Sequence, residues 1–140
     1  LLNEFDLLNS FYDDKSINIY KNINIGIAVD AGFGLKVIKI DKIDSEIDKI
    51  QSQLSLITKK YLSNDLNSTD MQDITFTITD LFNDGITFFT PLINKNNSSI
   101  LGICSLTENK FKIVLTFDHR VVEGKYCARF LGSLKKSLEG

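Results

Sequence analysis

In the stretch FKIVLTFDHRVVEG, residues 111–124 of this chain of 140 residues, the pattern of a strand leads directly to the start of a helical pattern. Every second residue from position 111 to position 117 is large and apolar, which predicts a β-strand with one buried face. His119, the only histidine of the chain, and Gly124 follow this run. Beyond Gly124, apolar residues recur every three or four positions, the spacing of one face of a helix, at Tyr126, Phe130, Leu134 and Leu138. The stretch therefore predicts a strand, a turn that holds His119, and a helix.

The same two-residue alternation of side chains occurs over residues 23–29 and 74–79. Residues 35–40 and 100–106 are short apolar stretches, and each of the four segments predicts a further strand. No repeat or internal linker interrupts the pattern. We therefore expect residues 1–140 to form a single mixed α/β domain whose centre consists mostly of strands.

Helical spacing occurs in two other segments. Apolar residues recur every three or four positions over residues 45–62, and Ser45 with Asp48 resembles a capping box, so we expect an amphipathic helix there. At the start of the chain, Leu1, Phe5 and Leu8 are spaced like one face of another helix. The mostly polar residues 63–73 predict a loop.

Composition argues against several classes of protein. With 43% hydrophobic residues the chain can bury a core, and its formal net charge of -2 indicates no affinity for nucleic acid or an anionic membrane. No apolar run approaches the length needed to cross a bilayer. Cys104 and Cys127 are too few for a disulfide framework and lack the spacing of a metal site. We interpret both as reduced packing residues of an intracellular protein and expect no metal.

His119 has two interpretations on the residues alone. A single histidine at the end of a strand is more often structural than catalytic. If the strand stays regular to position 119, however, His119 shares the apolar face of Phe117. Burial there would favour the neutral imidazole, which is the form that acts as a general base.

Four blocks of sequence, in order, resemble the catalytic domain of dihydrolipoamide acyltransferases, the core enzymes of 2-oxo acid dehydrogenase complexes. The blocks are NIGIAVD with GL (24–30, 34–35), TFTIT (75–79), FTPLIN with ILG (89–94, 100–102) and DHRVVEG (118–124). The last is similar to the family signature D-H-R-x-x-D-G, and the only proline, Pro91, falls where the family places one. The resemblance extends from about Leu1 to the C-terminus. It implies a chloramphenicol-acetyltransferase-like fold, a two-layer α/β sandwich with a mixed sheet, incomplete at its N-terminus.

The resemblance also implies a reaction. The histidine that matches His119 is the base that takes a proton from a thiol of dihydrolipoamide or coenzyme A, and the thiolate then attacks the partner thioester. A hydroxyl at the position of Thr79 stabilises the resulting oxyanion, although β-propensity alone would also explain Thr79. Asp118 and Arg120 match residues that order the histidine turn through charge-assisted hydrogen bonds.

The partners implied by the resemblance are a coenzyme A thioester and a lipoyl domain, without a metal. The resemblance further implies a homotrimer or a larger core. Its active site would lie between subunits, with His119 from one chain and Thr79 from its neighbour. The expected location is the cytoplasm, or the mitochondrial matrix if the source is eukaryotic.

The chain departs from the family pattern at several positions. Glu123 stands where the family has an aspartate that supports the active-site geometry, Phe82 replaces a usual glycine, and Ile38 sits where a proline is expected. The helices and the lipoyl domain that precede this region in the family are also missing from the sequence. We therefore expect a divergent enzyme. Two alternatives stay open: an acyltransferase of the same fold with a different acceptor, and a non-catalytic assembly subunit.

Overall fold

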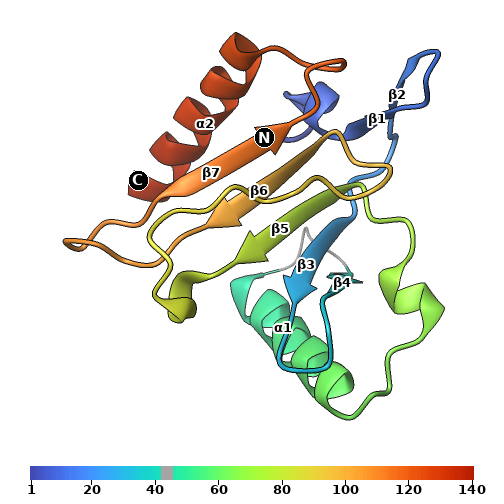
Figure 1. Ribbon diagram of the computed structural model, residues 1–140, viewed down its shortest axis with the longest axis vertical. Coiled ribbons are helices and arrows are strands. Elements are labelled where there is room, and N and C mark those ends of the chain that lie inside the picture. Colours follow the sequence, from blue (N-terminus) through green and yellow to red (C-terminus); the bar gives the residue numbers. More distant parts are fainter. Residues whose placement is uncertain (42–45) are drawn as a thin grey trace.

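The computed structural model describes residues 1–41 and 46–140, and its centre is a five-stranded mixed β-sheet (Figure 1). Its strands are β3 (Ile25–Val29), β4 (Lys36–Lys39), β5 (Phe76–Asp80), β6 (Ser99–Ile103) and β7 (Ile113–Phe117). The two α-helices are α1 (Ile47–Leu62) and α2 (Gly124–Glu139). These elements confirm the predicted mixed α/β class.

The order of the strands determines which residues meet at each end of the sheet. They lie side by side as β4-β3-β5-β6-β7, with β3, β5 and β6 parallel and the two edge strands antiparallel to them. The register places Thr79 of β5 between Ala28 of β3 and Gly102 of β6. The carboxyl ends of the three parallel strands therefore lie at one end of the sheet. The end of β7 that leads to His119 lies at the other.

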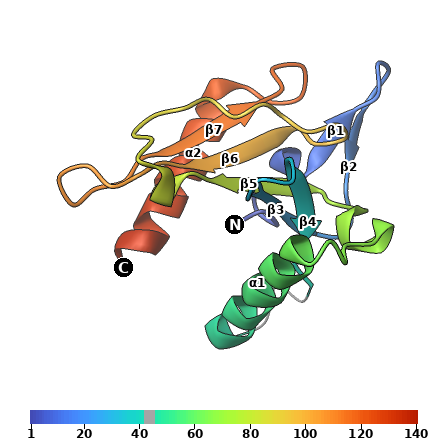
Figure 2. The ribbon, with the colours of Figure 1, turned by 60° about the horizontal axis from the view of Figure 1, so that its bottom comes forward.

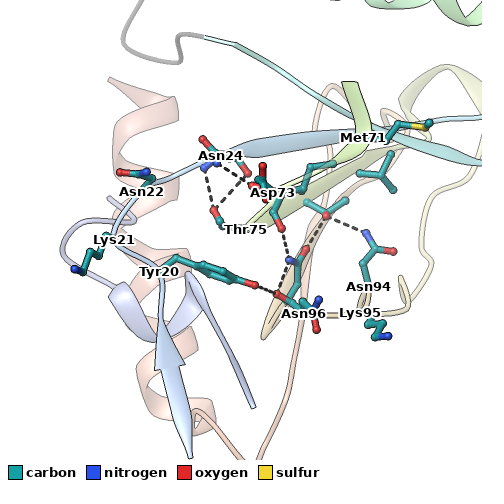
Figure 3. Close-up of a pocket in the computed structure, with 14 residues that line it drawn as sticks. Tyr20, Lys21, Asn22, Asn24, Met71, Asp73, Thr75, Asn94, Lys95 and Asn96 are labelled. Carbon is teal, nitrogen blue, oxygen red and sulfur yellow. Dashed lines mark hydrogen bonds between the residues drawn. The ribbon is translucent and has the colours of Figure 1, made fainter. Parts of the chain in front are cut away.

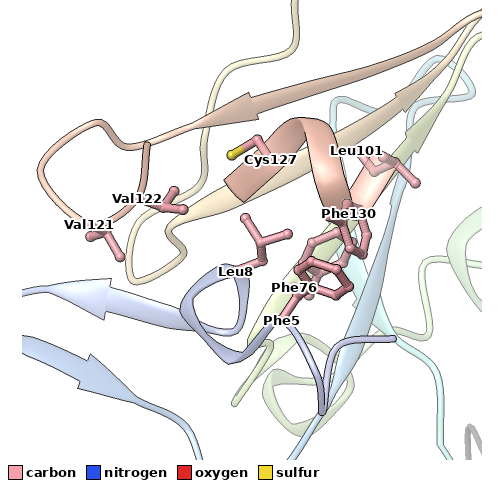
Figure 4. Close-up of a cluster of buried hydrophobic side chains, with 8 residues drawn as sticks. All are labelled: Phe5, Leu8, Phe76, Leu101, Val121, Val122, Cys127 and Phe130. Carbon is pink, nitrogen blue, oxygen red and sulfur yellow. The ribbon is translucent and has the colours of Figure 1, made fainter. Parts of the chain in front are cut away.

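Both helices lie on the same face of the sheet, which makes a two-layer sandwich (Figure 2). α2 packs over β5, β6 and β7 on a cluster whose buried members are Phe5, Leu8, Phe76, Leu101, Val121, Val122, Cys127 and Phe130 (Figure 4). On the same face, α1 packs against β3 and β4 through a second cluster with the buried residues Ile38, Ile40, Ile57 and Tyr61. Fully burying one large apolar side chain contributes roughly 1.5–3 kcal/mol, so these two clusters hold the helices on the sheet.

The connection between β5 and β6 crosses the opposite face of the sheet. A Cβ added to Gly102 would lie 2.8 Å from the ring of Phe89 and 3.3 Å from Pro91, so the connection touches β6 there. Nearby, the buried Thr77 hydroxyl donates to Oδ1 of Asn97 (2.8 Å) and accepts from Nδ2 of Asn94 (2.9 Å). These contacts hold an irregular connection in a place where parallel strands are usually joined by a helix.

The N-terminal region differs from the expectation. The predicted helix over residues 1–8 is instead a turn followed by a short 3₁₀ helix (Asp6–Leu8), although the predicted apolar residues Phe5 and Leu8 are buried. A hairpin of β1 (Ser10–Tyr12) and β2 (Ile17–Ile19) follows, and the sequence did not predict these strands. Each has only three residues, too few for an alternating pattern to stand out from chance.

Several element boundaries also differ from the prediction. β6 ends at Ile103 rather than at position 106. The Cys104 N–H still donates to the facing Lys112 carbonyl (2.9 Å), but the Ser105 N–H donates to the Ile86 carbonyl (2.7 Å), outside the β6–β7 pair. The predicted loop at 63–73 contains a 3₁₀ helix (Ser68–Met71). Ser45, the predicted cap of α1, lies outside the described residues. Within residues 1–41 and 46–140, no helix has the length and apolarity needed to cross a membrane.

Candidate active site

His119 lies in a turn between β7 and α2 that is anchored on both sides. Before it, the Asp118 N–H donates to the Ser98 carbonyl (2.7 Å). After it, the N–H groups of Val121 and Val122 donate to the Asp118 carbonyl (2.9 and 3.1 Å), and both valine side chains are buried. The backbone that carries the imidazole is therefore tied to the start of β6 and to the core.

The imidazole itself is exposed in the single chain. Its ring centre lies 5.6 Å from that of Phe117, with the two planes tilted by 46°. The condition for burial on the apolar face, a strand that stays regular to position 119, is not met, because the strand ends at Phe117 and the turn begins before position 119. The exposed ring is open to a substrate or to another subunit.

Arg120 and Asp118 form a bidentate ion pair beside the imidazole. Nε and Nη2 of Arg120 donate to the carboxylate oxygens of Asp118 at 3.0 and 2.7 Å, and the Arg120 backbone N–H donates to the same carboxylate at 2.9 Å. The side-chain hydrogen bond from Arg120 lowers the pKa of Asp118, and the same bond raises the pKa of Arg120. Such charge-assisted pairs are strong and directional, which agrees with the ordering role expected for these residues.

Arg120 also contacts the unpredicted hairpin. Its guanidinium carbon lies 4.6 Å from the centre of the Tyr12 ring, and its Nη1 lies 3.9 Å from a carboxylate oxygen of Asp14. Sequence reasoning missed Tyr12, because nothing in a three-residue strand indicates contact with a segment so far along the chain.

Glu123 occupies the N-cap position of α2. Its backbone is extended (φ -103°, ψ 158°), and its carbonyl accepts hydrogen bonds from the N–H groups of Tyr126 (3.0 Å) and Cys127 (3.2 Å). Its side chain is exposed and makes no capping hydrogen bond. The carboxylate therefore lies near the start of the helix, four positions after His119, without contributing to the cap.

Thr79 lies on the face of the sheet opposite to the helices, near the carboxyl end of β5. Its neighbours in the register, Ala28 and Gly102, have the smallest side chains. Across the described residues, the half-buried Thr79 hydroxyl makes no hydrogen bond to another group. Within the described residues, the hydroxyl is thus left without a hydrogen-bond partner.

The structure does not bring Thr79 and His119 together within one chain. Gly102 lies beside both Thr79 and Val114, and His119 follows Val114 by five positions on the way to the opposite end of the sheet. A strand rises about 3.3 Å per residue, which separates the two side chains by on the order of 15 Å.

Two clefts in the part of the chain that the structure describes lie elsewhere. One, of about 640 Å³, lies between the start of β5 and the Asn-rich connection before β6, where the Tyr20 hydroxyl donates to the Asn96 carbonyl (2.7 Å; Figure 3). A second, of about 740 Å³, lies on the helix-covered face and is lined by residues such as Phe76 and Phe130. His119, Thr79 and Glu123 line neither of them.

The two cysteines are free and buried. Burial raises the pKa of the Cys127 thiol, which disfavours its reactive thiolate. In the part of the chain that the structure describes, no group of three or more His, Cys, Asp or Glu residues could hold a metal ion.

Comparison with solved structures defines the class of fold. A chloramphenicol acetyltransferase chain matches 90% of this chain and 66% of its own length, with a TM-score of 0.55 and 12% identity, so the two share a fold. A family model described as 2-oxoacid dehydrogenases acyltransferase (catalytic domain) matches residues 1–140. The chain belongs to this acyltransferase family.

Relatives within the family are similar over nearly the whole chain. A dihydrolipoyllysine-residue acetyltransferase component of the pyruvate dehydrogenase complex from Buchnera aphidicola subsp. Schizaphis graminum is 34% identical over 96% of this chain and 37% of its own length. A dihydrolipoyllysine-residue succinyltransferase component of the 2-oxoglutarate dehydrogenase complex from Bacillus subtilis is 31% identical over 99% of the chain and 36% of its own length. The chain therefore spans little more than a third of these curated relatives.

Solved structures cover a larger share. A probable dihydrolipoamide acetyltransferase from Listeria monocytogenes has a TM-score of 0.89 and 29% identity, over 99% of this chain and 64% of that one. A dihydrolipoamide acetyltransferase from Azotobacter vinelandii has a TM-score of 0.83 and 31% identity, over 95% of this chain and 61% of that one. The Azotobacter structure was determined to investigate the role of a serine, a histidine and an asparagine in the catalytic mechanism, and that asparagine follows the histidine by four positions.

Proposed function

We propose that residues 1–140 form one catalytic domain, which moves an acyl group between a dihydrolipoyl thiol and coenzyme A. The observation that carries this proposal is the turn of His119 in a chain of this acyltransferase family. The turn presents the only histidine at the surface on a backbone fixed by Ser98, Val121 and Val122. The relatives named above include acetyltransferase and succinyltransferase components, which supports acyl transfer as the class of reaction.

In the proposed mechanism, Nε2 or Nδ1 of neutral His119 takes the proton from the thiol of one substrate. The thiolate attacks the thioester carbonyl of the other, and a tetrahedral oxyanion forms. The hydroxyl of Thr79 donates a hydrogen bond to this oxyanion. Collapse of the intermediate breaks the original carbon–sulfur bond, and the leaving thiolate takes the proton back from the imidazolium of His119. The reaction needs no metal and no redox change.

Glu123 has a supporting role in this proposal. It follows His119 by four positions, as the investigated asparagine follows the histidine in the Azotobacter enzyme. A residue at this spacing can orient or polarise the site without touching the transferred group. We propose that the Glu123 carboxylate does so through its charge.

We further propose that the active site forms between two copies of the chain, in a homotrimer or larger core, and that a lipoyl domain delivers the thiol. The separation of His119 and Thr79 at opposite ends of the sheet supports this, because one chain alone cannot apply both groups to one thioester. One of the similar solved structures is the cubic core of a pyruvate dehydrogenase complex. We propose the cytoplasm as the location, or the mitochondrial matrix for a eukaryotic source.

Replacement of His119 tests the function. The purified chain is assayed for transfer from acetyl-CoA and succinyl-CoA to dihydrolipoamide. Loss of a general base costs roughly 10²–10⁴-fold, so we expect His119→Ala and His119→Gln to lower kcat by that factor. Lys125→Ala, an exposed change in the first turn of α2, serves as the control and should act like wild type.

Circular dichroism shows whether the variants keep the fold. Unchanged turnover in folded His119→Ala would contradict the assignment of the base. A wild-type chain that acylates other small thiols but not dihydrolipoamide would indicate the alternative acceptor. A wild-type chain that acylates no thiol would indicate an assembly subunit.

A further inference from the structure

We propose that Tyr12, in the β1–β2 hairpin, is a positioning residue that orients His119 through Arg120. The inference rests on the proposed function, in which His119 is the base. It adds the β1–β2 hairpin, which lies far from the histidine turn in the sequence, to the proposed site.

The contact between the two elements is a cation–π interaction. Arg120 directly follows His119, and the Asp118 carboxylate binds its guanidinium group on one side. The guanidinium carbon lies 4.6 Å from the centre of the Tyr12 ring, inside the range of about 6 Å for such contacts. The pair with Asp14 is longer, at 3.9 Å, and the Asp14 side chain is 94% exposed, so it contributes little. The Tyr12 ring is the main contact of Arg120 with the hairpin.

The hairpin and the histidine turn share one support at the start of β6. Ser98 Oγ donates to the Leu7 carbonyl (2.7 Å) and Ser99 Oγ to the Leu8 carbonyl (2.9 Å), just before β1 begins. The Ser98 carbonyl accepts from the Asp118 N–H (2.7 Å) on the other side. The hairpin and the histidine turn are therefore both fixed to the start of β6. The contact between Tyr12 and Arg120 joins these two elements a second time, away from β6.

The contact between Tyr12 and Arg120 restricts the motion of the histidine turn, but it does not hold the buried clusters together. The Arg120 side chain is 60% exposed, so the contact can break while the buried clusters stay packed. With Tyr12 present, Arg120 is confined between an aromatic ring and a carboxylate, which restrains the adjacent peptide of His119. Displacement of a catalytic group by about 1 Å can cost about 100-fold in rate, so loss of this restraint should affect kcat before it affects the fold or substrate binding.

The single histidine makes the inference measurable without turnover. The imidazole C–H signals in an NMR spectrum come from His119 alone, and they report on its surroundings. Three variants are compared with wild type: Tyr12→Leu, which removes the ring; Tyr12→Phe, which keeps its π face; and Phe11→Leu. Phe11 is the matched control, because this adjacent half-buried aromatic residue packs on Tyr20 (5.1 Å between ring centres).

We expect Tyr12→Leu to shift or broaden the His119 signals and to lower kcat about tenfold, with KM changed less than twofold. Tyr12→Phe should resemble wild type in both measurements, and Phe11→Leu should leave the signals and kcat unchanged. Arg120→Lys, which keeps the charge but loses the planar cation, should reproduce the shift of Tyr12→Leu. It serves as the second route if Tyr12→Leu does not fold.

Two results would overturn the inference: His119 signals that stay at their wild-type positions in folded Tyr12→Leu, or an equal shift in Phe11→Leu. If Tyr12→Leu does not fold, unchanged signals in Arg120→Lys overturn it instead. The NMR result separates this inference from the proposed function. If His119→Ala keeps full turnover while the Tyr12→Leu signals shift, the function fails and the coupling stands. If the signals do not move but His119→Ala is slow, only the coupling fails.

Discussion

At the start of α2, the side chain of Glu123 stands at the helix end without capping it. Asp and Asn are strong N-cap residues, because their short side chains reach the free N–H groups of the first turn, whereas a glutamate is one methylene longer. The family resemblance places an aspartate here, and the Azotobacter enzyme has an asparagine four positions after its histidine. Glu123 thus leaves α2 without a side-chain cap at a position where the shorter aspartate or asparagine could supply one.

We expect Glu123→Asp to raise the free energy of unfolding by about 0.5–1 kcal/mol, because the shorter carboxylate can cap α2. The same variant should keep or raise kcat for acyl transfer. Glu123→Gln should lower kcat, by up to about 100-fold if the charge is needed for orientation. Urea unfolding and steady-state kinetics on both variants measure these effects. An Asp variant that loses activity while the Gln variant keeps it would show that the carboxylate has no orienting role.

At the scale of elements, two contacts hold segments that have no regular structure. The Tyr61 hydroxyl of α1 accepts hydrogen bonds from the N–H groups of Ala31 (3.1 Å) and Phe33 (3.0 Å) and donates to the Gly34 carbonyl (2.9 Å), so the helix fixes the β3–β4 loop. Across the sheet, Gly102 gives the ring of Phe89 the space it needs against β6. The Tyr61 hydroxyl thus holds the β3–β4 loop, and the absence of a side chain at Gly102 lets the β5–β6 connection lie against the sheet.

Two glycine substitutions should have opposite effects on stability. A Cβ in Gly102→Ala would lie 2.8 Å from Phe89, so we expect the free energy of unfolding to fall by about 1–3 kcal/mol as the connection is displaced. Gly132→Ala is the control within α2: nothing lies within 4 Å of its added Cβ, and alanine favours the helix by about 1 kcal/mol. Thermal denaturation of the two variants measures both changes. A Gly102→Ala variant as stable as wild type would show that the connection does not press on β6.

For the whole molecule, the two main residues of the proposed site lie far apart in one chain. His119 and Thr79 lie toward opposite ends of the sheet. The connection between β5 and β6 also exposes large apolar side chains, with Phe88 63% and Leu92 86% accessible. Exposed apolar groups of this kind favour association, and a closed ring of copies would place the His119 end of one chain against the Thr79 end of the next.

Mixing of two impaired variants tests this arrangement. His119→Ala and Thr79→Ala are each expected to be slow alone. In randomly mixed trimers, about a quarter of the interfaces would combine an intact His119 with an intact Thr79 from the neighbouring copy, so activity should recover to about a quarter of wild type. Light scattering on the same samples gives the oligomeric mass, which should exceed that of one chain. Absence of recovery in confirmed mixed oligomers would place both groups in one chain.

The residue pattern predicts most of the secondary structure at the centre of this protein, and the family resemblance adds the candidate site residues. β3, β5, β7 and the two described α-helices follow from periods of two and of three to four residues, because a half-buried element repeats its apolar side chains at its own period. β4 and β6 follow from short apolar runs. The roles expected for His119, Thr79 and Glu123 came from the resemblance of short sequence blocks to the acyltransferase family, and such blocks need only neighbouring residues. Neighbouring residues do not predict the Tyr12–Arg120 contact, the exposure of His119 or the hydrogen bonds between Tyr61 and the β3–β4 loop. These features join segments far apart in the sequence, or depend on the residue at which a strand ends. The distance between His119 and Thr79 likewise follows from strand order and register, and these are decided only when the whole sheet packs together.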